Sequence, residues 1–335
     1  MNFRSISLKS FRRVISFRFH WSSEIYSFGK IYRRWLKVPH FFPLLFTSDH
    51  GVNLGRAVDP NIFMNPNYCL PHLSWNSHII EATDFPKRFR RIGIVHPWAY
   101  WRMYTKTTPD PLESRKGSVV FISHSSGGSS TVGYNDQQII EYLDTLPEIL
   151  QPVSICVFYG DLFRQARLKV FTQHGFRIVT VGDPWSPNFV DNFYSLLANK
   201  RLLISQSYGS QIPLASEFGI PVVLIGQEIM EVDDESQLPK EYTSENADLL
   251  SLSTTAVKAL FKEFGETPTQ VQLEWARDKL GFRYLPNMKT VRRKLILVSF
   301  LFLPFWFISE TILGNLRRIL TEILRKLRPK RNLNS

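Results

Sequence analysis

The sequence predicts an α/β fold built on a doubly wound parallel sheet, and two patterns carry this prediction. Between residues 117 and 228, apolar runs of strand length alternate with amphipathic runs of helical length, and the connections are short. The strand runs are continuously apolar, which is typical of strands buried on both faces of a parallel sheet. Regular alternation of strand and helix indicates helices on both faces of that sheet. We therefore interpret residues 117–228 as a Rossmann-like domain.

The elements of this domain follow from local signals. Asn135 is suited to cap the first helix, while Gly175 and Gly219 are suited to end the second and the fourth. The expected strands lie at residues 119–123, 153–159, 177–181, 201–205 and 222–225. The expected helices lie at residues 135–150, 161–174, 188–199 and 213–218.

The N-terminal part of the chain has a weaker pattern. Residues 42–46 and 91–95 have the composition of strands, so a second, smaller α/β unit is expected before residue 115. Residues 109–116 are rich in turn formers and predict a linker. Helical segments within residues 248–280 are expected to pack back over the sheet. The predicted organisation is an N-terminal domain (1–115), a C-terminal domain (116–285) and a tail (289–335).

The charge distribution argues against binding to nucleic acid. The net charge is +12, yet residues 1–40 carry +8 and residues 289–335 carry +9, so the body between them carries −5. A nucleic-acid-binding protein usually has its basic surface on the folded body. Cys69 and Cys156 match no metal-binding spacing, and the N-terminus lacks the apolar core of a secretory signal. These features predict a cytoplasmic protein.

The tail contains an aromatic, apolar run at residues 295–313 with Arg and Lys on both sides. Pro304 and Glu310 interrupt the run, which is close to the length that spans a bilayer. Residues 312–327 then have Ile and Leu at helical spacing with Arg and Lys opposite. This pattern favours peripheral attachment to an anionic membrane surface. The alternative is a buried C-terminal helix that closes a domain.

The absence of several motifs disfavours several chemistries. The chain has no GxGxxG or GxxxxGK[ST] loop, no HExxH and no GxSxG, so hydride transfer, P-loop hydrolysis, zinc catalysis and an esterase elbow are all disfavoured. Polar residues follow the expected strands instead, where ligands of open α/β sheets bind. These candidate donor-site residues are His124, Ser125, Ser126, Gly160, Asp161, Gly182, Ser205, Gln206, Gly209 and Ser210. Small hydroxyls, backbone N–H groups and one imidazole suit a diphosphate and a sugar.

A second set of candidates lies in the N-terminal unit. Asp49 and His50 follow a predicted strand end, where a carboxylate would act as general base toward an acceptor hydroxyl and His50 would orient it. The alternative is a simple turn, because Asp and Gly are common turn formers. His96 follows the strand at residues 91–95 and is expected to line the acceptor side.

Several motifs together resemble the donor domain of GT-B glycosyltransferases, most of all those of bacterial capsule and lipopolysaccharide assembly. They are a strand ending in His-Ser ("GSVVFISHSS", 117–126) and a Ser-x-x-x-Gly-Ser stretch followed by "IPLASEFGIPVVLIG" (212–226). "SDHG" (48–51) and "VHPWAYWRMY" (95–104) appear in a similar order. One departure is that the paired glutamates of the commonest GT-B donor sites are missing, and Glu217 alone occupies a comparable place.

The resemblance implies two Rossmann-like domains that face each other across a cleft. It implies a metal-independent enzyme, without a cofactor, that transfers sugar from a nucleotide sugar to a glycan or lipid-linked glycan. Three other functions stay open at this point. They are a glycerol- or ribitol-phosphate transferase of the teichoic-acid type, a nucleotide-sugar 2-epimerase, and a non-catalytic membrane adaptor with a GT-B-like shell.

Overall fold

The computed structural model describes residues 21–52, 71–81, 91–123, 129–132, 135–163, 165–225, 230–233 and 255–306. The chain divides into two compact units, residues 1–288 and residues 289–335. The fold is mixed α/β with parallel sheets, as the sequence predicts. Both parallel sheets belong to the first unit.

The large sheet has five parallel strands in the order β7-β6-β4-β8-β9. The chain starts at the central strand β4, adds β6 and β7 on one side, and then crosses back to add β8 and β9 on the other. The direction of winding therefore changes between β4 and β8. The strands are β4 (Ser118–Phe121), β6 (Val153–Cys156), β7 (Arg177–Val179), β8 (Leu202–Ser205) and β9 (Val222–Leu224). The five predicted strands are thus confirmed, with shorter bounds.

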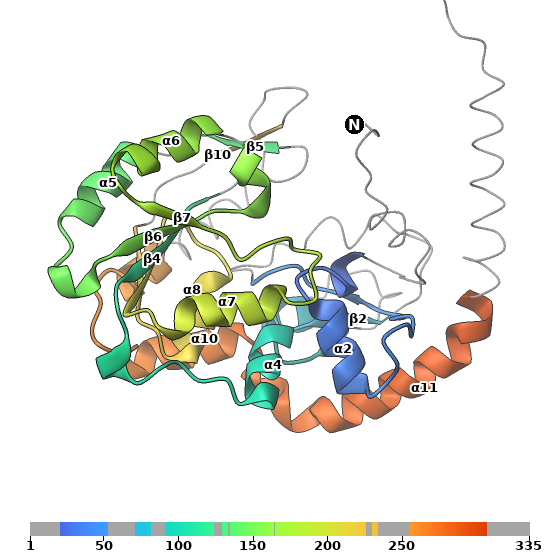
Figure 1. Ribbon diagram of the computed structural model, residues 1–335. Helices are drawn as coiled ribbons and strands as arrows, with labels where there is room; N and C mark the ends of the chain where they lie inside the picture. The colour runs from blue at the N-terminus through green and yellow to red at the C-terminus, as the bar shows by residue number, and fades with distance from the viewer. Residues whose placement is uncertain are drawn as a thin grey trace, which may run out of the picture. The chain divides into compact units, whose positions relative to one another are not determined.

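Helices cover both faces of this sheet (Figure 1). On one face α5 (Asp136–Asp144) and α6 (Gln165–Gln173) contribute Ile139, Leu143 and Phe171 to a core shared with the strands. On the other face lie α7 (Phe189–Ala198) and α8 (Gln211–Phe218), and α10 (Gln270–Lys279) packs on α8.

The predicted start of α5 and the predicted end of α8 are both confirmed. The Asn135 side chain accepts a hydrogen bond from Gln138 N at 3.0 Å, and Gly219 ends α8 with a φ of +91°. The predicted helix at residues 135–150 is interrupted, because η5 (Glu148–Leu150) forms a separate turn after Pro147.

The small sheet has three parallel strands in the order β1-β2-β3, with bounds Thr47–Ser48, His72–Ser74 and Arg91–Gly93. The prediction of a strand at residues 42–46 is wrong. Those residues are buried but irregular, and Pro43 has no N–H for a strand ladder. A short apolar run therefore predicts that its residues are buried more reliably than it predicts that they form a strand.

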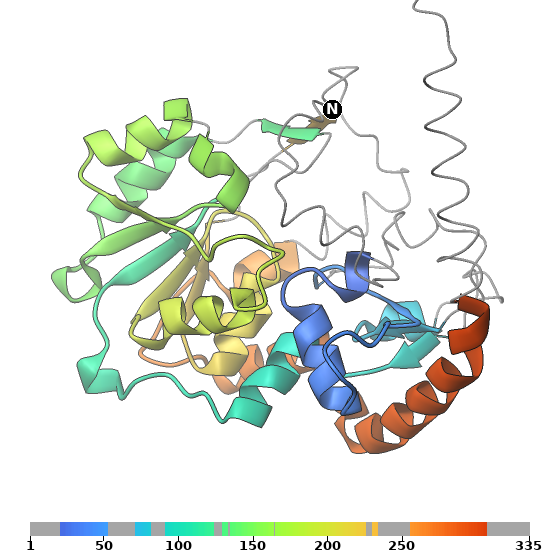
Figure 2. The same cartoon turned by 45° about the vertical axis from the view of Figure 1, so that its right-hand side comes forward.

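Two helices of the N-terminal part pack on each other, and the second of them also contacts α8 of the large sheet. In both views α4 (Pro97–Thr105) lies between α2 (Phe28–Leu36) and the helices of the large sheet (Figures 1 and 2). The predicted linker at residues 109–116 contains one short turn, η4 (Leu112–Ser114).

The remaining described elements are an antiparallel strand pair, several short helices and turns, and one long helix. An antiparallel pair, β5 (Ser129–Val132) with β10 (Met230–Asp233), has no counterpart in the sequence prediction. The short elements are η2 (Trp21–Ser23), α3 (Ser77–Glu81), η6 (Tyr159–Phe163), a helix at 255–260 and η7 (Phe282–Asn287). The last described helix is α11 (Met288–Trp306). None of the helices in the described ranges is both long enough and apolar enough to cross a membrane.

Candidate functional site

Hydrogen bonds join the carboxyl ends of β4 and β8, which are neighbouring strands of the large sheet. After β4, the Ser123 backbone N–H donates to Gln206 Oε1 at 2.8 Å, and the Ser123 and Ser207 hydroxyls lie 2.6 Å apart. β4 and β8 are the strands between which the winding reverses. Ligands of open α/β sheets bind outside the carboxyl ends of the strands at such a reversal.

Arg167 of α6 lies at the same strand ends. Its guanidinium donates to Ser123 O at 2.5 Å and to Gln206 Oε1 at 3.2 Å, and it forms a two-pronged ion pair with Asp136. Sequence reasoning missed this cation because no motif surrounds it. Its position in the sequence could have indicated it, because Arg167 lies in the first turn of the helix α6 that follows β6. The first turn of such a helix faces the carboxyl edge of the sheet.

The loop after β8 is shaped by its own polar side chains. Ser205 Oγ donates to Ser207 O at 2.6 Å and accepts from Gln211 Nε2 at 2.8 Å. Ser205 and Gln206 are both fully buried. Their polar atoms serve the loop, and direct contact of Ser205 and Gln206 with a ligand stays a prediction. Ser207 and Ser210 are partly exposed serines of this loop.

The strand-end loops of the two sheets meet at Ser210. Its hydroxyl accepts a hydrogen bond from Val52 N at 2.9 Å, and a Cβ on Gly51 would lie 3.2 Å from the same oxygen. Gly51 has a φ of +91°, a conformation that side chains disfavour. Thus the loop that begins at Asp49 contacts the loop that follows β8.

Asp49 is buried in a polar network at the ends of β1 and β2. Its carboxylate accepts from Ser74 Oγ at 2.5 Å and lies 2.9 Å from His72 Nε2. His72 Nδ1 lies 2.9 Å from Thr47 Oγ1, and all four side chains are buried. A carboxylate that is 1% exposed and bonded at both oxygens favours a supporting role, and the role of Asp49 as the base stays a prediction. Asp49 fixes the start of the loop.

The two remaining acceptor-side candidates have different environments. His50 is partly exposed, and its ring stacks on Tyr26 with centroids 5.0 Å apart. His96 is buried, and its Nδ1 accepts from Trp98 N at 3.2 Å as the cap of α4. Burial lowers the pKa of His96 to about 3, so the imidazole is neutral. In the structure His96 serves as the cap of α4, and its place on the acceptor side stays a prediction.

Glu217 has a structural partner, and its predicted donor contact stays a prediction. Its carboxylate, fully buried in α8, forms a two-pronged ion pair with Arg102 of α4, with Nε to Oε2 at 2.9 Å. Burial raises the pKa of this carboxyl, and the nearby Arg102 opposes that shift. The pair joins the helix layer beside the small sheet to the large sheet.

The other predicted site residues differ in how exposed they are, and three of them lie outside the described residues. Gly160 is exposed, Asp161 is buried in η6, and Gly182 has a φ of +102° beside Asn192. His124, Ser125 and Ser126 lie outside the described residues. Within the described ranges no group of three or more His, Cys, Asp or Glu side chains is arranged to hold a metal ion.

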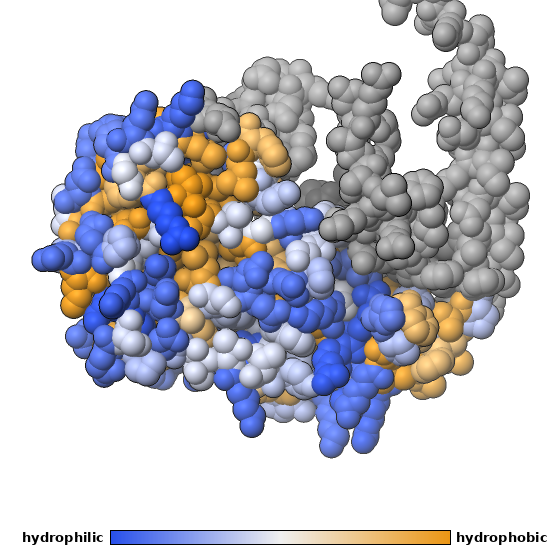
Figure 3. All heavy atoms as spheres, viewed as in Figure 1, coloured by the Kyte–Doolittle hydropathy of each residue, from blue (hydrophilic) through white to orange (hydrophobic). Residues whose placement is uncertain are grey.

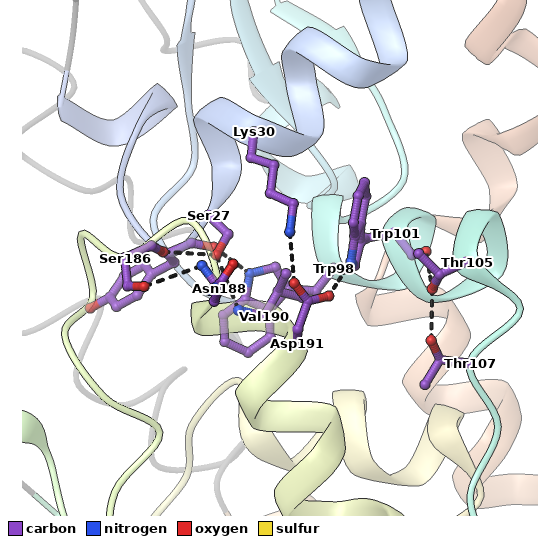
Figure 4. Close-up of polar contacts among 11 residues, drawn as sticks. Ser27, Lys30, Trp98, Trp101, Thr105, Thr107, Ser186, Asn188, Val190 and Asp191 are labelled. Carbon is purple, nitrogen blue, oxygen red and sulfur yellow. Dashed lines mark hydrogen bonds and ion pairs between the residues drawn. The ribbon is translucent and has the colours of Figure 1, made fainter. Parts of the chain in front are cut away.

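A second set of contacts joins α2 and α4 to α7 (Figure 4). Asp191 accepts from Lys30 Nζ and from Trp101 Nε1, both at 2.7 Å, and Lys30 lies over the Trp101 ring. Ser27 Oγ donates to Ser186 O and accepts from Val190 N, each at 3.1 Å. The two parallel sheets are therefore held together on the helix side as well as at Ser210.

No protein-family model matches this chain, and a search of curated proteins also returned no match.

Proposed function

We propose that this protein is a metal-independent glycosyltransferase that moves a sugar from a nucleotide sugar to a lipid-linked or surface-polysaccharide acceptor. The observation that carries the proposal is the polar network where β4 and β8 end, at the reversal of a doubly wound sheet. The GT-B-like arrangement belongs to this proposal: the large sheet would bind the donor and the small sheet would bind the acceptor.

The donor side would use three kinds of group. Ser207 and Ser210 are partly exposed serines beside the N-terminus of α8, and a helix N-terminus favours a phosphate. Arg167 supplies positive charge at the same strand ends. Among the residues that the structure describes, Glu217 is the counterpart of the donor-site glutamates of the commonest GT-B enzymes, and it is paired with Arg102.

On the acceptor side His50 is the best candidate for the general base. It would take the proton of the acceptor hydroxyl as the new glycosidic bond forms and the nucleoside diphosphate leaves. Asp49 and His72 would act as positioning residues, since their network fixes the loop that carries His50. The loop contacts Ser210 through Val52, which brings the two proposed half-sites together.

The proposed location is the cytoplasmic face of a membrane. The apolar run at residues 295–313 and the basic residues around it support attachment at the surface. Such a location suits an enzyme whose acceptor is linked to a lipid.

A thermal-shift panel tests the proposed activity. We expect the full-length protein to be stabilised by nucleotide sugars of one base, and Gly209→Val to abolish the shift. A Cβ at Gly209 would lie 2.3 Å from Gln211 Oε1, so the Gln211 side chain would have to move away from Ser205 Oγ, to which it donates. Ser207→Ala should weaken binding about 3- to 10-fold, the range of one lost hydrogen bond.

The exposed Ser114→Ala variant is the matched control and should bind like the parent. Stabilisation by cytidine-diphosphate-linked glycerol or ribitol alone would instead indicate a polyol-phosphate transferase. An unresponsive protein would contradict the enzyme proposal and favour an adaptor.

A further inference from the structure

Helix α11 has one face that is exposed along its whole described length. The exposed residues on this face lie three or four positions apart, which places them on one side of a helix. They are Thr290, Arg293, Lys294, Leu297, Phe300, Leu301 and Pro304. Leu295 and Ser299, which lie on the opposite side, are buried.

The chemistry of this face changes along the helix. Its N-terminal half has Arg293 and Lys294, and its C-terminal half has Leu297, Phe300 and Leu301. The three apolar side chains are 61%, 56% and 61% exposed, which is unusual for three neighbours on one helix face. Figure 3 colours part of the surface of α11 as hydrophobic.

Within α11 no negative charge offsets the basic half of the face. The sequence of α11 contains Lys289, Arg292, Arg293 and Lys294 and no Asp or Glu. Arg293 and Lys294 form no ion pair with any residue that the structure describes. The face is therefore apolar and cationic at once, and its occupant must be apolar and anionic.

An anionic lipid surface has this combination, and its depth fits the helix. From Arg293 to Leu301 the axis rises about 12 Å at 1.5 Å per residue. Interfacial helices bury their apolar face about 5–10 Å below the headgroups. A helix lying obliquely would thus place its cations among phosphates and its apolar residues among acyl chains.

We propose that this face of α11, residues 293–301, is the surface that docks the protein on an anionic membrane. Leu297, Phe300 and Leu301 enter the acyl boundary, and Arg293 and Lys294 contact the lipid headgroups. The inference names the residues through which the protein would attach to the membrane proposed above. It is argued from the helix alone and does not rest on the transferase activity.

Vesicle co-sedimentation of the full-length protein tests this surface. We expect binding to mixed phosphatidylserine–phosphatidylcholine vesicles and much weaker binding to pure phosphatidylcholine. Replacing Leu297, Phe300 and Leu301 together by Ser should weaken binding more than tenfold. Arg293→Gln with Lys294→Gln should weaken it about 25-fold at low salt, since each cation near such a surface is worth about fivefold.

Val271→Ser is the matched control, because Val271 is an equally exposed apolar residue, on α10. It should bind vesicles like the parent. Parental binding by the triple-Ser variant would overturn the proposal, as would equal binding to neutral vesicles. A parent that dimerises through this face and ignores vesicles would overturn it too. Each variant keeps its nucleotide-sugar response if it is folded, so failure here is separable from failure of the proposed activity.

Discussion

At the residue scale, His96 shows how burial converts a titratable side chain into a structural one. It lies against Trp75, with ring centroids 4.5 Å apart, and caps α4 through Nδ1. Burial lowers its pKa to about 3, against about 6.5 in the unfolded chain. The unfolded state therefore binds the proton more tightly than the native state does. The stability of the fold must then fall as the pH drops below about 6.5.

We expect this one group to remove about 2 kcal/mol of unfolding free energy between about pH 7.5 and pH 5. Urea denaturation at both pH values gives the loss. His96→Asn keeps a side-chain acceptor for the cap but does not titrate, so its loss over the same range should be about 2 kcal/mol smaller. An equal loss in both proteins would show that His96 already binds a proton in the native state.

The buried Asp49 network makes a second prediction at this scale. Ser74 donates the shorter of the two bonds to the carboxylate, at 2.5 Å, and is fully buried. Ser74→Ala should lower the free energy of unfolding by about 1.5–3 kcal/mol, because a hydrogen bond to a charged group is lost. The exposed Ser114→Ala should change it by less than about 0.5 kcal/mol. Similar values for both would mean that the Asp49 carboxylate is solvated.

The proposed base is tested by His50→Gln. A positioned general base is worth about 10²–10⁴-fold in rate, so release of the nucleoside diphosphate in the presence of acceptor membranes should slow by that factor. The thermal shift by the donor should be unchanged, because His50 is assigned to the other half-site. His40→Gln, at an exposed histidine, should behave like the parent. Parental turnover by His50→Gln would place the base elsewhere.

At the scale of elements, the two ion pairs on α2 and α4 should differ in strength. Arg102 pairs with a fully buried carboxylate, whereas the side chains of Lys30 and Asp191 are 31% and 43% exposed. Removing one partner of a buried pair leaves the other charge without compensation in a medium of low dielectric. Removing one partner of an exposed pair leaves it in water, at little cost.

We therefore expect Arg102→Met to lower the free energy of unfolding by about 3–5 kcal/mol. The double variant with Glu217→Leu should recover most of that loss, since no charge is then left buried. Lys30→Met, at the contact drawn in Figure 4, should cost about 1 kcal/mol or less. A double variant no more stable than Arg102→Met would show that α4 is held to α8 mainly by apolar packing.

At the scale of the whole molecule, both parallel sheets lie in the unit formed by residues 1–288, and the tail is a separate unit. Deleting residues 289–335 should leave a folded protein with a cooperative thermal transition. The same deletion should release the protein from membranes into the soluble fraction, because it removes a charge of +9 together with the apolar run. Continued sedimentation of residues 1–288 with membranes would contradict the proposed attachment by the tail.

The sequence by itself determined the large sheet and the ends of its helices. These are local properties: continuous apolar runs require burial on both faces, Asn135 satisfies a free backbone N–H, and Gly219 adopts a positive φ without strain. It also located the carboxyl edge of that sheet, because every parallel strand brings the residues that follow it to the same edge.

Only the tertiary structure decided which of the polar residues at that edge are exposed. In the sequence nothing distinguishes three of these residues, Asp49, His96 and Glu217, from residues that contact a ligand. In the structure each of them is buried and bonded to a partner between 2 and 115 positions away in the chain. Arg167 reaches the strand ends from inside a helix, and β2 consists of only three residues. The identity of a buried polar partner depends on long-range packing, which no local pattern encodes.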